Sequence, residues 1–277
     1  MKLLREASPA AVSWRFLSCR VHELTAGETI SLTSASEETL LVLVAGSIHV
    51  AGEGIDEIVS RETPFGKVGA VVYFPPRFLV SVTALAGSEI ATGSAPADGR
   101  FAARVVRPED MSGEVRGGGS ATRQVVTTFA APIPAERLMS YEAWVPRGSW
   151  TGWPPHRHDG LDGSPYLEET YYYRFDRAAG FGIHRNFDLP RGLNDLTPVD
   201  DRSLVAVPSG YHLSAAGPGS NAWILNFLAG QPEDRDQPPL FDSEETWIAD
   251  DWSSGAMDLP AVQVAGKLTA SPESDQT

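Results

Sequence analysis

Two histidines separated by a single residue carry the clearest chemical signal in the chain. His156 and His158 lie in the stretch PPHRHD, and a β-strand there would point both imidazoles to one face and Arg157 to the other. Two imidazoles on one face are a suitable pair of ligands for a divalent metal ion. The spacing therefore predicts one edge of a metal site.

A carboxylate follows after a short turn. Residues 167–175, LEETYYYRF, favour a strand, and the Gly, Asp, Ser and Pro residues before them favour a turn that returns the chain to the histidines. Glu168 and Glu169 are neighbours, so only one of them can face the imidazoles. We favour Glu169, which places Tyr171 and Tyr173 on the same inner face, and we expect Glu168 to be a solvated or interface carboxylate.

A third histidine completes the predicted ligand set. His212 follows a Pro-Ser-Gly-Tyr turn on a later predicted strand. Three imidazoles and one carboxylate suit zinc, manganese, iron or nickel without selecting among them, and the single cysteine, Cys19, argues against a closed thiolate site. An octahedral ion with four protein ligands leaves positions open for substrate oxygens, which implies Lewis-acid chemistry.

The other histidines and Asp159 are not expected to be metal ligands. His184 lies on a predicted strand and is either a group that supports the ligands or transfers a proton, or an ordinary surface or core histidine. We expect Asp159, like Glu168, to be a solvated or interface carboxylate, and we assign no role to His22 or His49.

Short apolar segments separated by glycine and proline predict an all-β fold that positions these residues. The chain has 26 glycines and 21 prolines in 277 residues. The predicted strands fall into two series, 38–45, 47–51, 68–74, 78–84 and 89–93, then 123–129, 138–145, 167–175, 182–187, 203–207, 211–215 and 222–228. The glycine-rich residues 117–120 lie at the junction. We predict an N-terminal unit over 1–116, a C-terminal unit over 117–265 and a disordered tail over 266–277.

The two series share a local pattern that suggests an internal repeat. VVYFPPRFLVSVTA in the first series resembles LVAVPSGYHLSAAG in the second, each with an apolar strand, a proline-containing turn and a return strand. The first has Phe78 near the place where the second has His212, and it lacks the paired histidines. We therefore expect metal only in the C-terminal unit.

Composition limits the partners and the compartment. A formal net charge of -14 argues against nucleic acid and anionic membranes as partners. A single cysteine excludes an intrachain disulfide and favours a reducing setting. No stretch approaches the roughly 18 apolar residues of a membrane span, and the N-terminus does not resemble a signal peptide. We expect a soluble cytoplasmic protein.

Several blocks of the sequence, in order, resemble the 5-deoxy-glucuronate isomerase family of myo-inositol catabolism, a bicupin group related to the 4-deoxy-5-ketouronate ketol-isomerases of pectin breakdown. The resemblance covers nearly the whole chain. Its blocks are GEVRGGGSATRQV, GSWTGWPPHRHD, YLEETYYY, Gly180-Phe181, VPSGYHLSAAGPG and LNFLAG.

The resemblance implies two tandem cupin β-barrels with a metal in the C-terminal one, and interconversion of 5-deoxy-glucuronate with 2-deoxy-5-keto-gluconate. The family's metal ligands fall on His156, His158, Glu169 and His212. The segment before the prolines departs from the usual GNWSSYPPH at Ser149, Thr151, Gly152 and Trp153. These changes leave the ligands untouched and bear on substrate specificity.

An aldose–ketose isomerase must move a proton or a hydride between adjacent carbons, and a divalent ion that chelates both oxygens stabilises the developing charge. Tyr171, Tyr173 and His184 are the candidates for proton transfer. Arg185 and Arg123 are the candidates for holding the substrate carboxylate.

The partner is therefore expected to be a small sugar acid, and a homo-oligomer is a further expectation. The alternatives are an isomerase of a related deoxy-keto-uronate, a metal-dependent dioxygenase, and a sugar-binding cupin without catalysis.

Overall fold

The computed structural model describes residues 1–235 and 237–252, and its strands form three sheets in which neighbouring strands run antiparallel. Helix is confined, among these residues, to two short α-helices and three 3-10 turns. The predicted all-β class is confirmed. The tail predicted for 266–277 lies outside the described residues. No helix in the described part of the chain is long and apolar enough to cross a membrane.

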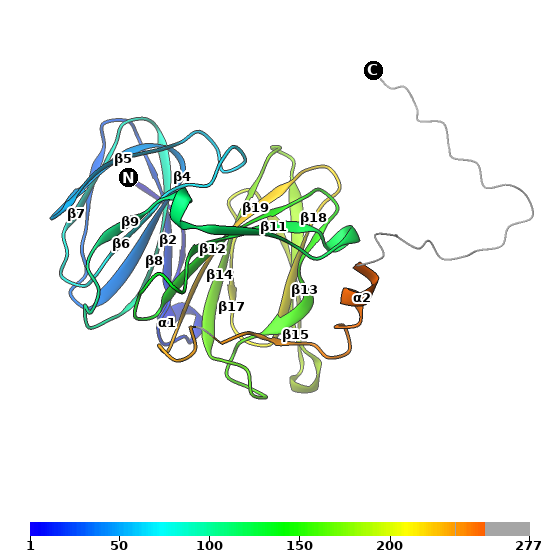
Figure 1. Cartoon of the computed structure of the whole chain (residues 1–277). Coiled ribbons are helices and arrows are strands. Elements are labelled where there is room, and N and C mark those ends of the chain that lie inside the picture. The colour runs from blue at the N-terminus through cyan, green and yellow to red at the C-terminus, as the bar shows by residue number, and fades with distance from the viewer. Residues whose placement is uncertain (236, 253–277) are drawn as a thin grey trace, which may run out of the picture.

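The N-terminal unit is built on one branched sheet of nine strands in which β4 is shared between two layers (Figure 1). Its elements are β1 (Lys2–Ala7), α1 (Pro9–Val12), β2 (Ser18–Leu24), β3 (Thr29–Leu32), β4 (Glu37–Gly52), β5 (Ile55–Arg61), β6 (Val71–Phe74), β7 (Val80–Ala84), β8 (Ser88–Pro96) and β9 (Arg104–Val106), followed by the 3-10 turn η1 (Pro108–Asp110).

Strand β4 is long because it serves both layers of this unit. Its first half pairs with β8 and β6, and its second half pairs with β5 and β7. Gly46 lies at the change of partner with a φ of 109°, and a Cβ there would lie 2.5 Å from the carbonyl oxygen of Gly87. Only glycine fits this bend without strain. The two strands predicted over 38–45 and 47–51 are thus one.

The C-terminal unit consists of two facing sheets. One has the order β10-β11-β12-β19-β14-β17 and the other β16-β15-β18-β13-β20. The elements are β10 (Ser112–Arg116), η2 (Gly119–Ala121), β11 (Arg123–Phe129), β12 (Leu138–Val145), β13 (Trp150–Arg157), β14 (Leu167–Phe175), β15 (Phe181–Asp188), η3 (Leu189–Arg191), β16 (Leu193–Asp200), β17 (Leu204–Val207), β18 (Tyr211–Ala216), β19 (Ala222–Gly230), β20 (Leu240–Phe241) and α2 (Ile248–Trp252).

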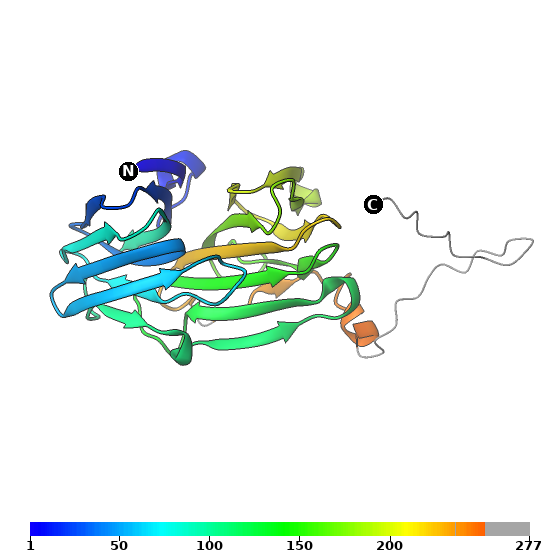
Figure 2. The same cartoon turned by 90° about the horizontal axis from the view of Figure 1, so that it is seen from above.

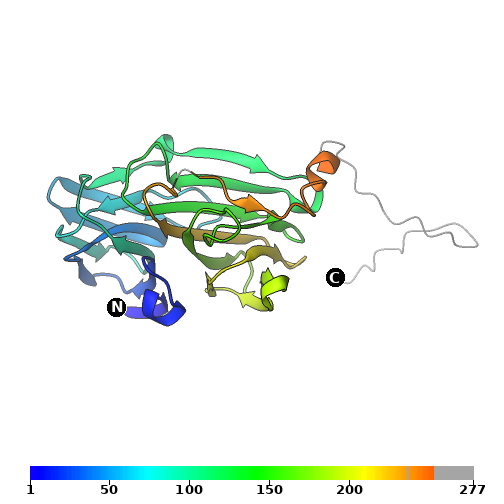
Figure 3. The same ribbon diagram turned by 90° about the horizontal axis from the view of Figure 1, so that it is seen from below.

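Alternation along β14 separates two cores. Tyr171 and Tyr173 pack inside the C-terminal unit, whereas Tyr172 packs into a cluster that contains residues of both units. This shared cluster includes Leu40 and Val42 from β4, so the two larger sheets face each other. Figures 2 and 3 show the two units side by side along the long dimension of the molecule.

The change of sheet falls earlier than the predicted junction. β9 pairs with β6 in the N-terminal unit, but β10, which a boundary after residue 116 would leave in that unit, pairs with β11 in the C-terminal unit. All five residues of β10 are exposed and alternate too weakly in polarity to predict a strand. The predicted domain boundaries, 1–116 and 117–265, stay predictions.

Candidate metal centre

Four side chains converge inside the C-terminal unit. One nitrogen of each of His156, His158 and His212 and one carboxylate oxygen of Glu169 all lie within 4.8 Å of one another. His156 is on β13, Glu169 is on β14 and His212 is on β18, and His156 is paired directly with His212 across the sheet. The structure brings together all four residues that the sequence suggested as ligands.

The orientation of His158 is set by its hydrogen bonds. This residue follows the last residue of β13, and its Nδ1 lies 2.7 Å from the carbonyl oxygen of Leu167, which accepts a hydrogen bond from it. With the proton on Nδ1, Nε2 is the nitrogen available to a metal ion, and here it contacts Glu169 Oε2 at 2.9 Å. Release of the proton that bridges this contact leaves the tautomer that a metal ligand requires.

Glu169 lies at the centre of the group, and both its oxygens have partners. Oε2 also lies 3.1 Å from His212 Nε2, and Oε1 accepts a hydrogen bond from Asn226 Nδ2 at 2.9 Å. Asn226 was missed by the sequence analysis. The signal was present, because Asn226 is the polar residue in the otherwise apolar run AWILNFLAG.

Burial and mutual contact favour the metal-binding protonation state at three of the four groups. Burial acts against the charge of His158, but its contact with Glu169 outweighs burial and raises its pKa, so this imidazole must release a proton to bind an ion. Burial, reinforced by His212 and His158, lowers the pKa of His156 well below its ordinary value, and burial also lowers the pKa of His212. Burial acts against the charge of Glu169, but His158 and His212 outweigh it and lower its pKa. Two imidazoles are thus neutral and the carboxylate is ionised.

Unsatisfied atoms show that this group fits a metal ion. Nδ1 of His212 is buried without a hydrogen-bond partner within the described residues, and its Nε2 has the 3.1 Å ion-pair contact with Glu169 alone among them. Buried polar atoms without partners are uncommon, because each costs about 1–3 kcal/mol. Three imidazoles and a carboxylate are a donor set suited to a divalent transition ion, and the four residues can hold one.

The register separates the two adjacent glutamates as predicted. Glu168 points away from the histidines and accepts hydrogen bonds from the backbone N–H groups of Arg15, Phe16 and Leu17 and from the Tyr166 hydroxyl. It holds the segment before β2 against β14. Glu168 is therefore an interface carboxylate.

A cavity of about 540 Å³ opens above the predicted ligands. Its lining includes His156, His158 and Glu169 together with Tyr171 and Arg123. Tyr171 extends from β14 on the same face as Glu169. A molecule the size of a sugar acid fits this space.

Arg123 is the substrate-binding candidate that the structure brings to this cavity. It is 9% exposed, and its Nη1 donates to the carbonyl oxygen of Ala121 at 3.0 Å. Its Nε is buried without a hydrogen-bond partner among the described residues. Burial, with Arg116 nearby, lowers the pKa of Arg123 to about 10, so it remains a cation at neutral pH.

Arg185, the other arginine candidate, does not line the cavity. Its neighbour His184 is buried within the unit, so alternation along β15 turns Arg185 outward. There its guanidinium donates to Asn194 Oδ1 and lies 4.2 Å from the centre of the Phe187 ring. The sequence could not separate the two arginines because their strands had no assigned partners.

Tyr173 and His184 lie one layer below the cavity and do not line it. The Tyr173 hydroxyl is 2.9 Å from His184 Nδ1 and 2.6 Å from Ser214 Oγ. Burial, reinforced by His212, lowers the pKa of His184 to about 3, so its imidazole is neutral. These residues are connected to one another, whereas Tyr171 faces the open space.

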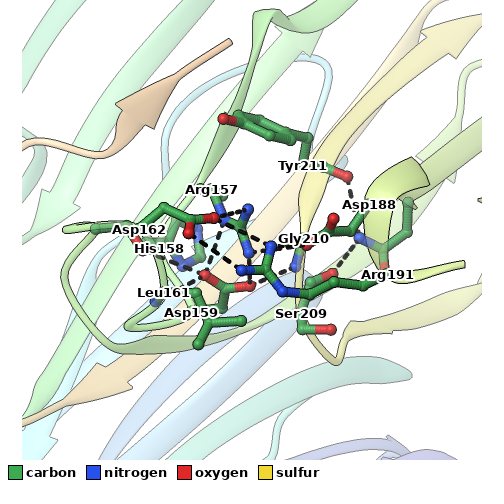
Figure 4. Close-up of polar contacts among 12 residues, drawn as sticks. Arg157, His158, Asp159, Leu161, Asp162, Asp188, Arg191, Ser209, Gly210 and Tyr211 are labelled. Carbon is green, nitrogen blue, oxygen red and sulfur yellow. Dashed lines mark hydrogen bonds and ion pairs between the residues drawn. The ribbon is translucent and has the colours of Figure 1, made fainter. Parts of the chain in front are cut away.

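Of the two states expected for Asp159, solvated or interface carboxylate, the structure excludes the solvated one. Its side chain is 8% exposed and pairs with Arg157 through two hydrogen bonds of 3.0 and 2.7 Å (Figure 4). Arg157 points away from the metal ligands, as strand alternation predicted. It is nevertheless buried, and its charge requires carboxylate partners.

Comparison with known proteins identifies relatives over most of the chain. Residues 2–248 match the family model described as the KduI/IolB family. The chain is 33% identical over 228 residues to the 5-deoxy-glucuronate isomerase of Geobacillus thermodenitrificans, covering 80% of this chain and 83% of that protein. It is 28% identical over 236 residues to the Bacillus subtilis protein of the same name, covering 83% and 87%.

Two solved structures have folds similar to that of this chain. An IolB-like protein from Salmonella typhimurium superposes with a TM-score of 0.83 at 33% identity, covering 88% of this chain and 94% of that one. A variant of the Bacillus subtilis oxalate decarboxylase superposes with a TM-score of 0.59 at 14% identity, covering 86% and 74%. The second likeness concerns the fold alone, which is of the cupin type.

Proposed function

Because the chain belongs to the KduI/IolB family, we propose that it is a 5-deoxy-glucuronate isomerase that forms 2-deoxy-5-keto-gluconate with the help of a divalent metal ion. The observation that carries the proposal is the convergence of His156, His158, Glu169 and His212 on one point beside a cavity with a buried arginine. The family name alone would not explain why these groups meet.

The four ligands would hold the ion from three strands. A bound divalent ion supplies Lewis acidity, which polarises a carbonyl group and stabilises negative charge on adjacent oxygens. Asn226 would fix the orientation of Glu169 through its 2.9 Å hydrogen bond. The chemistry of the donor set admits zinc, manganese, iron or nickel.

Arg123 would bind the carboxylate of the substrate. Its guanidinium lines the same cavity as the ligands and has a buried Nε to offer. A guanidinium can hold a carboxylate through two parallel hydrogen bonds, which fixes both position and orientation. The sugar carbons would then lie between Arg123 and the metal ligands.

Tyr171 is the group we assign to proton transfer. Of the three candidates from the sequence, it alone lines the cavity together with Glu169. Tyr173 and His184 would act through it, because the rings of Tyr171 and His184 are 4.9 Å apart. A phenol in this position can give a proton to, or take one from, a substrate oxygen.

The central experiment follows 5-deoxy-glucuronate by NMR with purified protein, before and after chelation and after addition of single metal ions. We expect product to form, turnover to stop on chelation and one or more divalent ions to restore it. Loss of substrate with oxygen consumption and without formation of this isomer would indicate a dioxygenase instead. Absence of turnover with every ion would contradict the proposed function.

A matched pair of arginine variants tests the substrate carboxylate. Arg123→Gln should raise KM by about 10- to 100-fold, because a charge-assisted contact contributes roughly 1.5–3 kcal/mol. Arg185→Gln removes an outward-facing guanidinium on β15 and should leave KM unchanged. Equal effects of the two substitutions would contradict the assignment.

Deuterium oxide distinguishes the two routes for hydrogen. A base that exchanges with solvent would place deuterium on the carbon that gains hydrogen, whereas direct hydride transfer would not. Tyr171→Phe should slow the reaction, and Tyr172→Phe is its control, since that hydroxyl donates to Glu89 on the opposite face at 2.9 Å. The homo-oligomer and the cytoplasmic location expected from the sequence stay predictions.

A further inference from the structure

We propose that a buried network of charges centred on Arg157 positions the metal ligands and thereby sets the metal affinity of the site. The network lies on the face of the chain opposite the cavity, because Arg157 alternates with the cavity-lining His156 and His158. Figure 4 shows its polar contacts. The inference rests on the proposed function only in that the four ligands must bind a metal. It assigns Arg157 and Asp159 as positioning residues.

The guanidinium of Arg157 is surrounded by carboxylates. Nε and Nη2 donate to the two oxygens of Asp159 at 3.0 and 2.7 Å, Nη1 donates to Asp162 at 2.8 Å, and Nη2 also donates to Asp188 at 3.0 Å. Arg157 is 2% exposed. This fork of donors fixes the rotation and the position of the guanidinium, which a single ion pair would not do.

Two of the segments joined by these bonds carry metal ligands. Arg157 is the residue between His156 and His158, so its position fixes the backbone from which both imidazoles project. Asp159 Oδ2 also accepts a hydrogen bond of 2.7 Å from the backbone N–H of Gly210. Gly210 lies two residues before His212, so the same carboxylate holds both segments.

Further contacts close the network around the His212 turn. The Arg157 guanidinium lies 5.1 Å from the centre of the Tyr211 ring, next to His212. Arg191 of η3 donates to Asp188 at 2.8 Å and to Asp162 at 3.1 Å. Two arginines are thus balanced by three aspartates: Asp159 just after β13, Asp162 in the following turn and Asp188 at the end of β15.

The N-terminal unit shows that the turn itself does not need these charges. There the corresponding turn, Pro75 to Phe78, is held by the backbone N–H of Arg77 donating to the carbonyl oxygen of Ser34 at 2.6 Å. Arg77 and Gly210 both have positive φ, 63° and 81°. The unit without ligands uses a neutral backbone contact, and the unit with ligands uses a buried charge network. Ligand positioning accounts for this difference.

The experiment compares two conservative variants with a matched control. Arg157→Lys keeps the charge but cannot form the paired bonds to Asp159 while reaching Asp162 and Asp188. Asp159→Asn keeps the size of the side chain and weakens its paired hydrogen bonds with Arg157. It provides the test if Arg157→Lys does not fold. Arg61→Lys is the control, because Arg61 is fully buried, pairs with Glu142 at 2.6 Å and lies between the units.

Each purified, metal-free protein is titrated with Mn²⁺, and the bound ion is examined by electron paramagnetic resonance. We expect Arg157→Lys and Asp159→Asn to raise the dissociation constant by about 10- to 100-fold and to change the Mn²⁺ spectrum. Arg61→Lys should lower the melting temperature and leave both metal readouts unchanged.

The inference is overturned if the folded Arg157→Lys or Asp159→Asn protein binds Mn²⁺ with the wild-type constant and spectrum. A merely structural role would lower the melting temperature in all three variants alike. The titration does not use turnover, so its result is independent of whether 5-deoxy-glucuronate is the substrate. Failure of wild-type protein to bind Mn²⁺ or any other divalent ion would instead contradict the proposed metal site.

Discussion

The N-terminal and C-terminal units share a strand order but differ in what their inner faces carry. The order β2-β8-β4-β6 in one corresponds to β12-β19-β14-β17 in the other. In both, an interior strand begins with a glutamate on the face shared between the units, Glu38 on β4 and Glu168 on β14. The two units therefore share a strand order and a glutamate contact between them, and the difference lies in their inner faces.

The register identifies which residues replace the ligands. Glu169 is paired with Val207 at the end of β17, and Thr39 is paired with Phe74 at the end of β6. His212 is paired with His156, whereas Val80 is paired with Leu32. The N-terminal unit therefore has Thr39, Val80 and Leu32 where the C-terminal unit has Glu169, His212 and His156.

This register corrects the sequence comparison in one detail. Phe78, which the repeat placed near the position of His212, lies before β7 and packs near Phe74, with ring centres 6.5 Å apart. The residue in the equivalent position is Val80, because the turn before β7 is one residue longer. Val80 is fully buried in an aliphatic core. An aliphatic interior and a candidate metal centre are therefore alternatives within the same framework.

The largest expected effect is the loss of activity when Glu169, the proposed carboxylate ligand of the C-terminal unit, is replaced. Glu169→Gln should reduce isomerisation by about 10³-fold, since it removes a charged ligand and with it the stabilisation of developing negative charge. Thr39→Val, at the equivalent position of the other unit, should leave the rate unchanged. NMR assays of both variants provide the measurement, and an equal loss in both would contradict the assignment of the metal to one unit.

Exchanging residues between the units should have unequal effects on the free energy of unfolding. Val80→His buries an imidazole without partners and should lower the free energy of unfolding by about 3 kcal/mol. His212→Val removes a buried Nδ1 without a hydrogen-bond partner in the described structure together with the 3.1 Å contact to Glu169, and it should change the stability of the metal-free protein by less than about 1 kcal/mol. Denaturant titration of the metal-free proteins tests this, and a large loss in His212→Val would show that the imidazole has a structural role.

The two equivalent glutamates, Glu38 and Glu168, should make similar contributions to the free energy of unfolding. Glu38 accepts backbone N–H groups of Glu136, Arg137 and Leu138 at 2.7–2.9 Å, just as Glu168 binds the segment before β2. Changing either to Gln should cost about 2 kcal/mol of unfolding free energy, because charge-assisted bonds become neutral. Thermal melts provide the measurement. A loss confined to one variant would show that only one contact joins the units.

The smallest effect concerns the core shared between the units. Burial raises the pKa of the Cys19 thiol from 9.0 to about 12. Because the folded value lies above the unfolded one, its contribution to stability is present below pH 9 and is lost as the pH rises toward 12. A thiol reagent at pH 8 should react with unfolded protein and not with native protein. Rapid labelling of native protein would show that the shared core opens.

The sequence alone determined what depends on short-range geometry. Alternation along a strand placed His156 and His158 on one face and separated Glu169 from Glu168, because the side-chain period of a strand is independent of its neighbours. The strands 123–129, 138–145 and 167–175 were predicted with the bounds that β11, β12 and β14 have. The exposed strands β10 and β16 were missed because water, rather than a core, faces most of their residues.

Only the tertiary structure decided what depends on strand pairing. It placed His212 opposite His156, brought Asn226 to Glu169, and turned Arg123 inward and Arg185 outward. The burial of Asp159 with Arg157 also depends on β15 and the β18 turn, which come later in the chain. Pairing is a choice among strands that look alike in sequence, and the free energy that settles it comes from burial of the assembled sheets.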